Sequence, residues 1–127
     1  MKIEMYDGLP VVSVILSYKE MTMCLHDVLL DTGCSTTIFD TDEVEKIGLI
    51  MDRNNGMPRR MYGVGGESEH CYEQIVSNIK INDYLFDSFR LQLGITKETY
   101  GFNGILGVDF MTESAIIIDF KEMIVHR

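Results

Sequence analysis

The chain has 127 residues, of which 46% are hydrophobic and 24% charged, and these values are typical of a soluble globular protein. The length suffices for one hydrophobic core without metal or disulfide support, so we expect a single domain over residues 1–127. Eleven Lys and Arg against twenty Asp and Glu give a formal net charge of −9, which argues against nucleic acid and an anionic membrane surface as partners.

The first predicted element is a β-hairpin. Residues Leu9–Tyr18 and Met21–Leu30 are apolar runs rich in Val, Ile and Leu, and they flank the turn-like pair Lys19 and Glu20. The second strand leads the chain directly into Asp31. This hairpin therefore places one carboxylate at the end of an apolar strand.

A short helix and a glycine-rich hairpin are expected next. Asp40 is a suitable helix N-cap, acidic residues follow it, and Gly48 is a suitable end. Residues 52–60 are polar and predict a loop. Residues 60–64 and 68–75 then bracket a cluster of glycines, which predicts a hairpin with a glycine-rich tip.

The last third repeats the pattern of short strands and turns. Residues 74–81 and 84–93 surround the turn signal Asn82-Asp83, and 108–112 are long enough for one helical turn. A glycine-bounded segment, Gly104-Ile105-Leu106-Gly107, precedes that turn, and 115–120 with 123–125 predict a closing hairpin. Short apolar runs separated by Gly, Asn and Asp predict an all-β domain with one or two short helices.

The segment Leu29-Leu30-Asp31-Thr32-Gly33-Cys34-Ser35 carries the strongest chemical signal. A catalytic carboxylate needs a rigid and partly dry position, and a following glycine lets the backbone turn sharply and donate its N–H to that carboxylate. Asp-Thr-Gly alone is a common turn sequence. Its meaning comes from the apolar strand before it and from the short helix, glycine-rich hairpin and Gly-Ile-Leu-Gly segment that follow in order.

In this order the segments resemble the retropepsin-like aspartic peptidases, whose single lobe is a closed β-barrel. LLDTGCSTTIF resembles the active-site loop of that family, and MYGVGGES falls where its substrate-covering flap lies. GILGVDFM and AIIIDFKEMIV resemble its second glycine turn and its closing hairpin. The resemblance covers most of the chain and therefore implies an aspartic endopeptidase, a hydrolase of peptide bonds.

The resemblance also implies roles for individual residues. Asp31 would be the catalytic carboxylate, Thr32 would form a hydrogen bond across a dimer, and Gly33 would supply the backbone geometry below the carboxylate. The substrate-binding residues would be Tyr62, Gly63, Val64, Gly65 and Gly66 in the flap, with Ile105 and Leu106 beside the active-site loop.

The reaction needs two carboxylates, whereas the chain has one Asp-Thr-Gly. The resemblance therefore implies a homodimer in which each subunit supplies one Asp31. Two like charges close together share one proton, so one carboxylate activates water and the other acts as the acid. We expect a peptide or protein substrate with apolar side chains near the scissile bond, no cofactor and no metal.

The three cysteines, Cys24, Cys34 and Cys71, cannot all pair within the chain, and none lies in a Cys-x-x-Cys spacing. Free thiols and an N-terminus without the apolar stretch of a signal peptide predict a cytoplasmic protein. Cys34 follows Asp-Thr-Gly where the family usually has Ala or Ser. This residue either packs as a small apolar side chain or makes activity sensitive to oxidation.

Three other interpretations remain open at this point. A thiol enzyme would combine Cys34 or Cys71 with His26 or His70. A metal site would combine Cys24, His26, Asp27 and Asp31, two of which share a strand face. The third and strongest alternative is a catalytically silent retropepsin-like dimer that binds peptides or acts in assembly through strand addition.

Overall fold

The computed structural model of the protein describes residues 1–62 and 68–127. Its strands are β1 (Glu4–Tyr6), β2 (Leu9–Tyr18), β3 (Met21–Leu30), β4 (Ile38–Asp40), β5 (Gly56–Tyr62), β6 (Ser68–Ile81), β7 (Tyr84–Gly94), β8 (Gly104–Leu106), β9 (Ile117–Asp119) and β10 (Ile124–His126). Its helices are α1 (Thr41–Val44), the 3-10 turn η1 (Glu45–Ile47), α2 (Lys97–Tyr100) and α3 (Val108–Glu113). None of the helices in these residues has the length and apolar character needed to cross a lipid bilayer.

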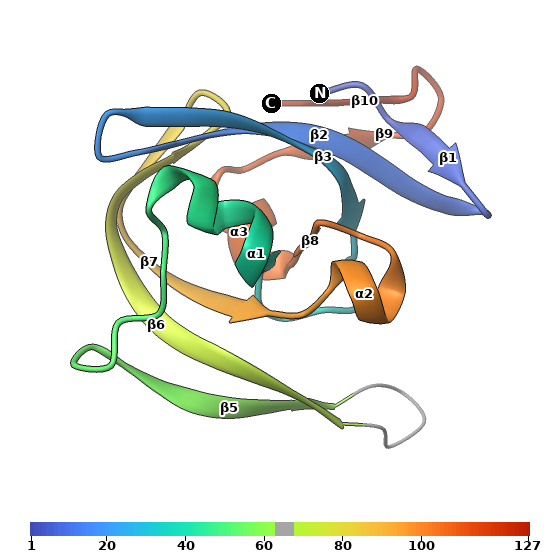
Figure 1. Ribbon diagram of the computed structural model, residues 1–127. Coiled ribbons are helices and arrows are strands. Elements are labelled where there is room, and N and C mark those ends of the chain that lie inside the picture. Colours follow the sequence, from blue (N-terminus) through green and yellow to red (C-terminus); the bar gives the residue numbers. More distant parts are fainter. Residues whose placement is uncertain (63–67) are drawn as a thin grey trace.

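Eight strands form one sheet in the order β1-β2-β3-β8-β4-β7-β6-β5. An additional pairing between β2 and β6, at Leu16 with Ile81 and Ser17 with Lys80, closes six of these strands into a barrel around the main core (Figure 1). Fully buried side chains inside the barrel include Leu16, Phe39 and Phe86. The all-β class predicted from the short apolar runs and the closed barrel implied by the resemblance are both confirmed.

The first hairpin joins β2 and β3 as predicted, and it contains a β-bulge. Val12 pairs with Val28 but Val14 pairs with Leu25, so His26 and Asp27 together lie opposite a single residue. Asp27 adopts the left-handed conformation, with φ of 55°. The extra residue lets Leu25 and Val28, three positions apart, both point into the core.

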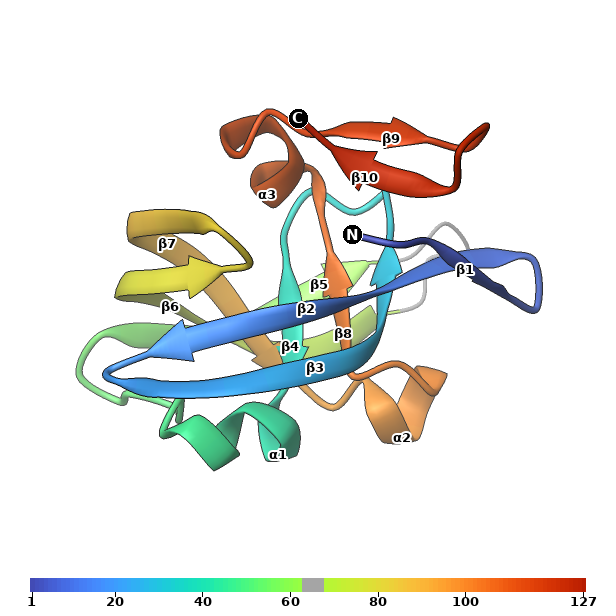
Figure 2. The same ribbon diagram turned by 90° about the horizontal axis from the view of Figure 1, so that it is seen from above.

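β8 lies between β3 and β4 in the sheet, although β3 and β4 are consecutive in the chain, and this order shapes the candidate site. β3 lies parallel to β8 on one side, with Leu30 beside Leu106, and β4 lies antiparallel to β8 on the other, with Ile38 beside Ile105. Because β3 and β4 are consecutive in the chain, the connection over residues 31–37 must cross the end of β8. Figure 2 shows this connection arching over β8 between β3 and β4.

Both chain ends lie together on one side of the molecule. The Ile3 N–H donates to the Met123 carbonyl at 2.9 Å, and the Val125 N–H donates to the Met1 carbonyl at 2.6 Å. The N-terminal segment therefore extends the small sheet of β9 and β10 within the same chain, and the predicted closing hairpin is present (Figure 2).

The structure departs from the predicted elements at residues 56–60 and at β1, β4 and α2. Residues 56–60 belong to β5, although their polar composition predicted a loop. Pro58 is tolerated there because β5 is an edge strand. The short strands β1, β4 and β8 and the helix α2 are too brief to give a periodic sequence signal, so β1, β4 and α2 were not predicted.

Candidate active site

Asp31 lies immediately after β3, where its backbone and its carboxylate are both held. The Asp31 N–H donates to the Leu106 carbonyl at 3.0 Å, which continues the β3–β8 ladder by one residue. The Gly33 N–H donates to Asp31 Oδ1 at 2.9 Å, and the Cys34 N–H donates to the Asp31 carbonyl at 3.1 Å. Asp31 is half-buried, whereas Thr32 and Gly33 are exposed, so the carboxylate is fixed in place beside an open surface.

The loop over residues 31–37 wraps tightly around the chain that leaves β8. The Val108 N–H donates to the Cys34 carbonyl at 2.8 Å, and the Asp109 N–H donates to the Ser35 carbonyl at 3.3 Å. A Cβ atom on Gly107 would lie 2.6 Å from the carbonyl carbon of Thr36. Only a glycine lets the two backbones approach this closely, which explains the second glycine of the Gly-Ile-Leu-Gly segment.

Thr37 and Asp109 fasten this loop from the inside. Asp109 accepts the Thr37 N–H at 3.1 Å and the Thr37 hydroxyl at 2.7 Å, while the same hydroxyl accepts the Gly107 N–H at 3.1 Å. Asp109 also accepts the Phe110 N–H at 2.7 Å. Because Thr37 is fully buried, these bonds are shielded from water and hold the Asp31 loop against the start of α3.

A second apolar cluster lies on the opposite face of the sheet from the main core. Leu29 pairs with Ile105 and Ile105 pairs with Ile38, so these neighbouring side chains share one face. Ile38 and Ile105 are buried together with Cys71 of β6, and Leu29, Cys34 and Met61 pack around them. The cluster therefore connects the Asp31 loop to the β5–β6 hairpin through apolar contacts.

The predicted substrate-binding residues occupy different environments. Ile105 belongs to the second apolar cluster, whereas the Leu106 side chain is fully buried in the main core and its carbonyl holds Asp31. Tyr62, the last described residue of β5, is 72% exposed. Gly63, Val64, Gly65 and Gly66 lie outside the described residues. The roles predicted for these residues in binding substrate remain predictions.

The cysteine environments do not favour thiol chemistry. Burial raises the pKa of the Cys34 thiol above its usual value. Hydrogen bonds to Thr36 lower the pKa in part, and the nearby Asp31 and Asp109 carboxylates raise it, so the net change is upward. Burial also raises the pKa of Cys71 to about 11. A nucleophilic thiol needs a lowered pKa instead. His70 lies 3.2 Å from Arg60, on the exposed side of β6.

The alternative metal site is also not assembled in the described part of the chain. Cys24 Sγ and His26 Nδ1 are 3.9 Å apart, on the exposed side of β3. His26 Nδ1 also lies 2.9 Å from the Ser13 hydroxyl. Within residues 1–62 and 68–127, no group of three or more His, Cys, Asp and Glu side chains is placed to hold a metal ion.

Sequence reasoning missed several residues that shape the site. The role of Thr37 was not predicted, although it lies within the quoted active-site loop, and Asp109 lay unnoticed in the GILGVDFM segment. Cys71 and Met61 became relevant only when the β5–β6 hairpin was placed against β4 and β8. The useful signal would have been Asp109 itself, an acidic residue two positions after the Gly-Ile-Leu-Gly segment. Its carboxylate accepts the hydrogen bonds that Thr37 donates from the Asp31 loop.

Comparisons with known proteins agree with this geometry. Residues 25–110 match the family model described as aspartyl protease. The fold is similar to the crystal structure of a retropepsin-like aspartic protease from Rickettsia conorii, with a TM-score of 0.62, 15% sequence identity, and coverage of 98% of this chain and 86% of that one. A search of curated proteins gave no significant match.

A second solved structure shows the same fold. It is the retroviral protease-like domain of Ddi1 from Leishmania major, with a TM-score of 0.55, 16% identity, and coverage of 91% of this chain and 86% of that one. At these identities the two structures establish the fold, and the family model extends over the segment that contains Asp31, β8 and the start of α3. The chain therefore belongs to the aspartyl protease family and has the retropepsin-like fold.

Proposed function

We propose that the protein is an aspartic endopeptidase whose catalytic pair consists of one Asp31 from each subunit of a homodimer. The observation that supports this most directly is how the Asp31 carboxylate is held. Backbone N–H groups fix both its main chain and its Oδ1 atom, while the adjacent Thr32 and Gly33 remain exposed. These contacts hold the carboxylate in a fixed position beside an open surface, as a catalytic acid requires.

The homodimer follows from the number of carboxylates. Each chain has one Asp-Thr-Gly sequence, and the proposed reaction needs two such acids. Exposed apolar side chains are available for a contact between subunits, because Ile117 of β9 is 53% exposed and Phe120 is 58% exposed. Among the described residues, β9 pairs with β10 alone, so its outer edge is open to another strand.

The chemistry follows from bringing two carboxylates together. Two like charges at close range cannot both ionise cheaply, so the pair holds one proton between them. The ionised Asp31 takes a proton from a water molecule, and that water attacks the peptide carbonyl carbon. The protonated Asp31 donates to the carbonyl oxygen, and a proton then passes to the leaving amine as the C–N bond breaks.

The second apolar cluster supports a preference for apolar substrate side chains. Ile38 and Ile105 lie on the same face of the sheet as Leu29. Leu29 is two residues before Asp31, and Met61 of β5 packs against this cluster. Ile38 and Ile105 are buried. An extended peptide passing Asp31 would therefore meet this cluster at its partly exposed members, Leu29 and Met61. Val64 was also predicted to contact the substrate, but it lies outside the described part of the chain.

The proposal is tested by cleavage of a peptide library and of unfolded casein from acid to neutral pH, together with the molecular mass in solution. Asp31→Asn should reduce cleavage at least about a thousandfold while leaving the dimer intact. Asp27→Asn is the matched control, because Asp27 is an exposed acid on β3 whose left-handed backbone suits Asn. This control should cleave like the parent protein.

Two results would reject the proposal. A dimeric parent protein that cleaves nothing over this pH range would favour the silent peptide-binding module instead. Cleavage by a protein that stays monomeric at every concentration would exclude the paired-carboxylate mechanism. A library profile dominated by charged residues beside the scissile bond would reject the apolar preference alone.

A further inference from the structure

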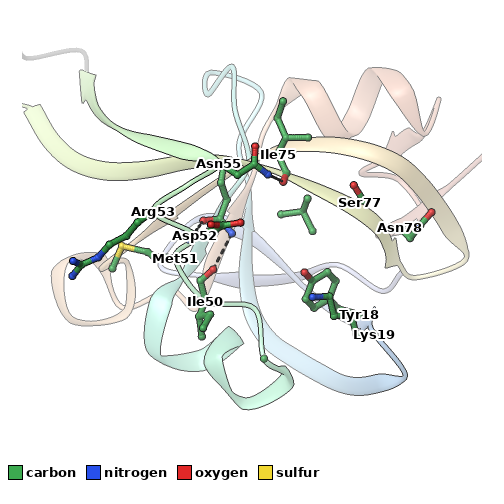
Figure 3. A pocket seen from close by; sticks show the side chains of 13 residues that line it. Tyr18, Lys19, Ile50, Met51, Asp52, Arg53, Asn55, Ile75, Ser77 and Asn78 are labelled. Atoms are coloured by element: carbon green, nitrogen blue, oxygen red, sulfur yellow. Dashed lines mark hydrogen bonds between the residues drawn. The ribbon is translucent and has the colours of Figure 1, made fainter.

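A hollow of about 700 Å3 opens between the turn of the first hairpin, the segment before β5 and the middle of β6. Figure 3 shows Arg53, Met51 and Ile50 on one side of it and Tyr18 and Lys19 on the other, with Ser77 and Asn78 above Tyr18 and Lys19. None of its lining residues belongs to the Asp31 loop or to the second apolar cluster. The hollow is therefore separate from the candidate active site.

One wall of the hollow is a gap in the sheet. On one edge of β6, pairing with β5 ends at Gln74 and pairing with β2 begins at Lys80. In between, β6 pairs with β7 along its other edge. In the described part of the chain, no strand covers the open edge over residues 75–79, so this edge can accept another strand.

The direction of the backbone groups can be worked out from one hydrogen bond. The Ile75 carbonyl accepts the Asn55 side-chain N–H at 3.0 Å, so the polar backbone groups of Ile75 face the gap. In an antiparallel pair these directions alternate, and Ser77 therefore also turns its N–H and C=O toward the gap. Asn78, with φ of 55°, interrupts the extended backbone there, and pairing with β7 resumes at Ile79 in the same register. Ser77 thus presents one donor and one acceptor to the hollow.

The remaining surface of the hollow is apolar and positively charged. Ile50, Met51 and Ile75 line it and are 56%, 50% and 44% exposed, respectively. Its charged residues are Lys19, Arg53 and Asp52, which leaves one net positive charge on a chain whose total is −9. Asp52 already accepts the Asn54 N–H at 3.0 Å, and Arg53 has no ion-pair partner among the described residues.

We propose that this hollow binds an extended segment of a partner protein in which aliphatic and acidic side chains alternate. The segment adds a short strand to the open edge of β6 and exchanges backbone hydrogen bonds with Ser77. Its aliphatic side chains lie against Ile50, Met51 and Ile75, and its acidic side chains reach Arg53 and Lys19. This binding does not depend on peptidase activity.

The test measures fluorescence polarisation of a labelled seven-residue peptide of alternating Val and Glu. The full chain carries Asp31→Asn so that no probe is hydrolysed. The peptide should bind saturably, and a matched Val and Lys peptide should bind at least about tenfold more weakly, since a charge pair is worth about one order of magnitude in affinity when partly desolvated. Arg53→Glu should weaken binding of the Glu peptide by a similar factor, whereas Lys121→Glu, an exposed charge outside the hollow, should not.

The backbone contact has its own pair of variants. Ser77→Pro removes the N–H that faces the gap, whereas Ser77→Ala keeps it, so only the proline variant should weaken binding. If the proline variant fails to fold, the amide NMR signals of Asn55, Ser77 and Asn78 in the unsubstituted chain must shift when the peptide is added. Equal binding of both peptides, unchanged binding by Arg53→Glu, or shifts confined to residues 31–37 would overturn the proposal.

Discussion

Thr37 and Asp109 lie 72 positions apart and are joined by two hydrogen bonds, at 3.1 Å and 2.7 Å. The first comes from a backbone N–H and the second from a hydroxyl, so Asp109 binds both the main chain and the side chain of Thr37. Because the same hydroxyl accepts the Gly107 N–H, one side chain joins the Asp31 loop to the start of α3 at two points. The rigidity of the Asp31 loop is thus provided by residues outside the Asp-Thr-Gly sequence.

Replacing Thr37 by Val should destabilise the protein by about 2–3 kcal/mol, because it leaves the Gly107 N–H without its buried acceptor and removes one of the two hydrogen bonds to Asp109 Oδ1. Thr37→Ser keeps the hydroxyl and loses one methyl group, so it should cost about 1 kcal/mol. Urea unfolding of the three proteins measures the difference. Equal losses for Val and Ser would show that packing, and not the hydrogen bonds, holds the loop.

Gly107→Ala should cost more than about 3 kcal/mol, because the new Cβ would meet the backbone of Thr36 and Cys34, neither of which can rotate away. Gly107 has φ of −96°, which any residue adopts, so the loss would arise from collision alone. The control is Gly101→Ala, where φ is 83° and the space around the Cβ is open. Conformational strain alone should cost about 1 kcal/mol there.

Asp40 should be required for the start of α2. Its buried Oδ1 atom accepts the N–H groups of Thr96 and Lys97 at 3.0 Å and 2.9 Å. Asp40→Ala should lower stability by about 2 kcal/mol, because two backbone donors lose an ionised acceptor. Hydrogen exchange should accelerate most at the amides of Thr96 and Lys97. Acceleration spread evenly over the barrel would instead indicate a general loss of packing.

The raised pKa of Cys71 should make stability fall with rising pH. The thiol has an ordinary pKa of 9.0 and a pKa of about 11 in the folded protein. Between these values the unfolded chain has released the proton and the folded chain still holds it, so the unfolded state binds fewer protons and stability decreases as pH rises. Below about pH 9 the thiol is protonated in both states, and its full contribution to the free energy of unfolding is present.

Unfolding in urea at intervals from pH 8 to pH 11 measures this effect when the parent protein is compared with Cys71→Ala. Other titrating groups, such as the tyrosines, contribute equally to both proteins and cancel in the difference. The stability of the parent relative to the variant should decline through the window given by the two pKa values. A difference that stays constant with pH would mean that the Cys71 thiol ionises equally in both states.

Local patterns in the sequence account for the hairpins and for the position of Asp31. Apolar runs of about five to ten residues separated by turn residues predict strands, because strand alternation and turn conformations depend on neighbouring residues. The same logic predicted the first hairpin, the long hairpin of β6 and β7, the helical turn after Gly107 and the closing hairpin. The order of motifs identified the family, and the aspartyl protease match bears this out.

Only the tertiary structure decided what lies beside Asp31. β4 and β8 have three residues each, so their pairing follows from the burial of Ile38, Ile105 and Leu106 and not from any local signal. The bond between Thr37 and Asp109, the placement of Cys71 in the second apolar cluster and the open edge of β6 arise in the same way. A sequence specifies which residues prefer a strand, but the partners of each strand are chosen by the free energy of closing one core, to which distant segments contribute together.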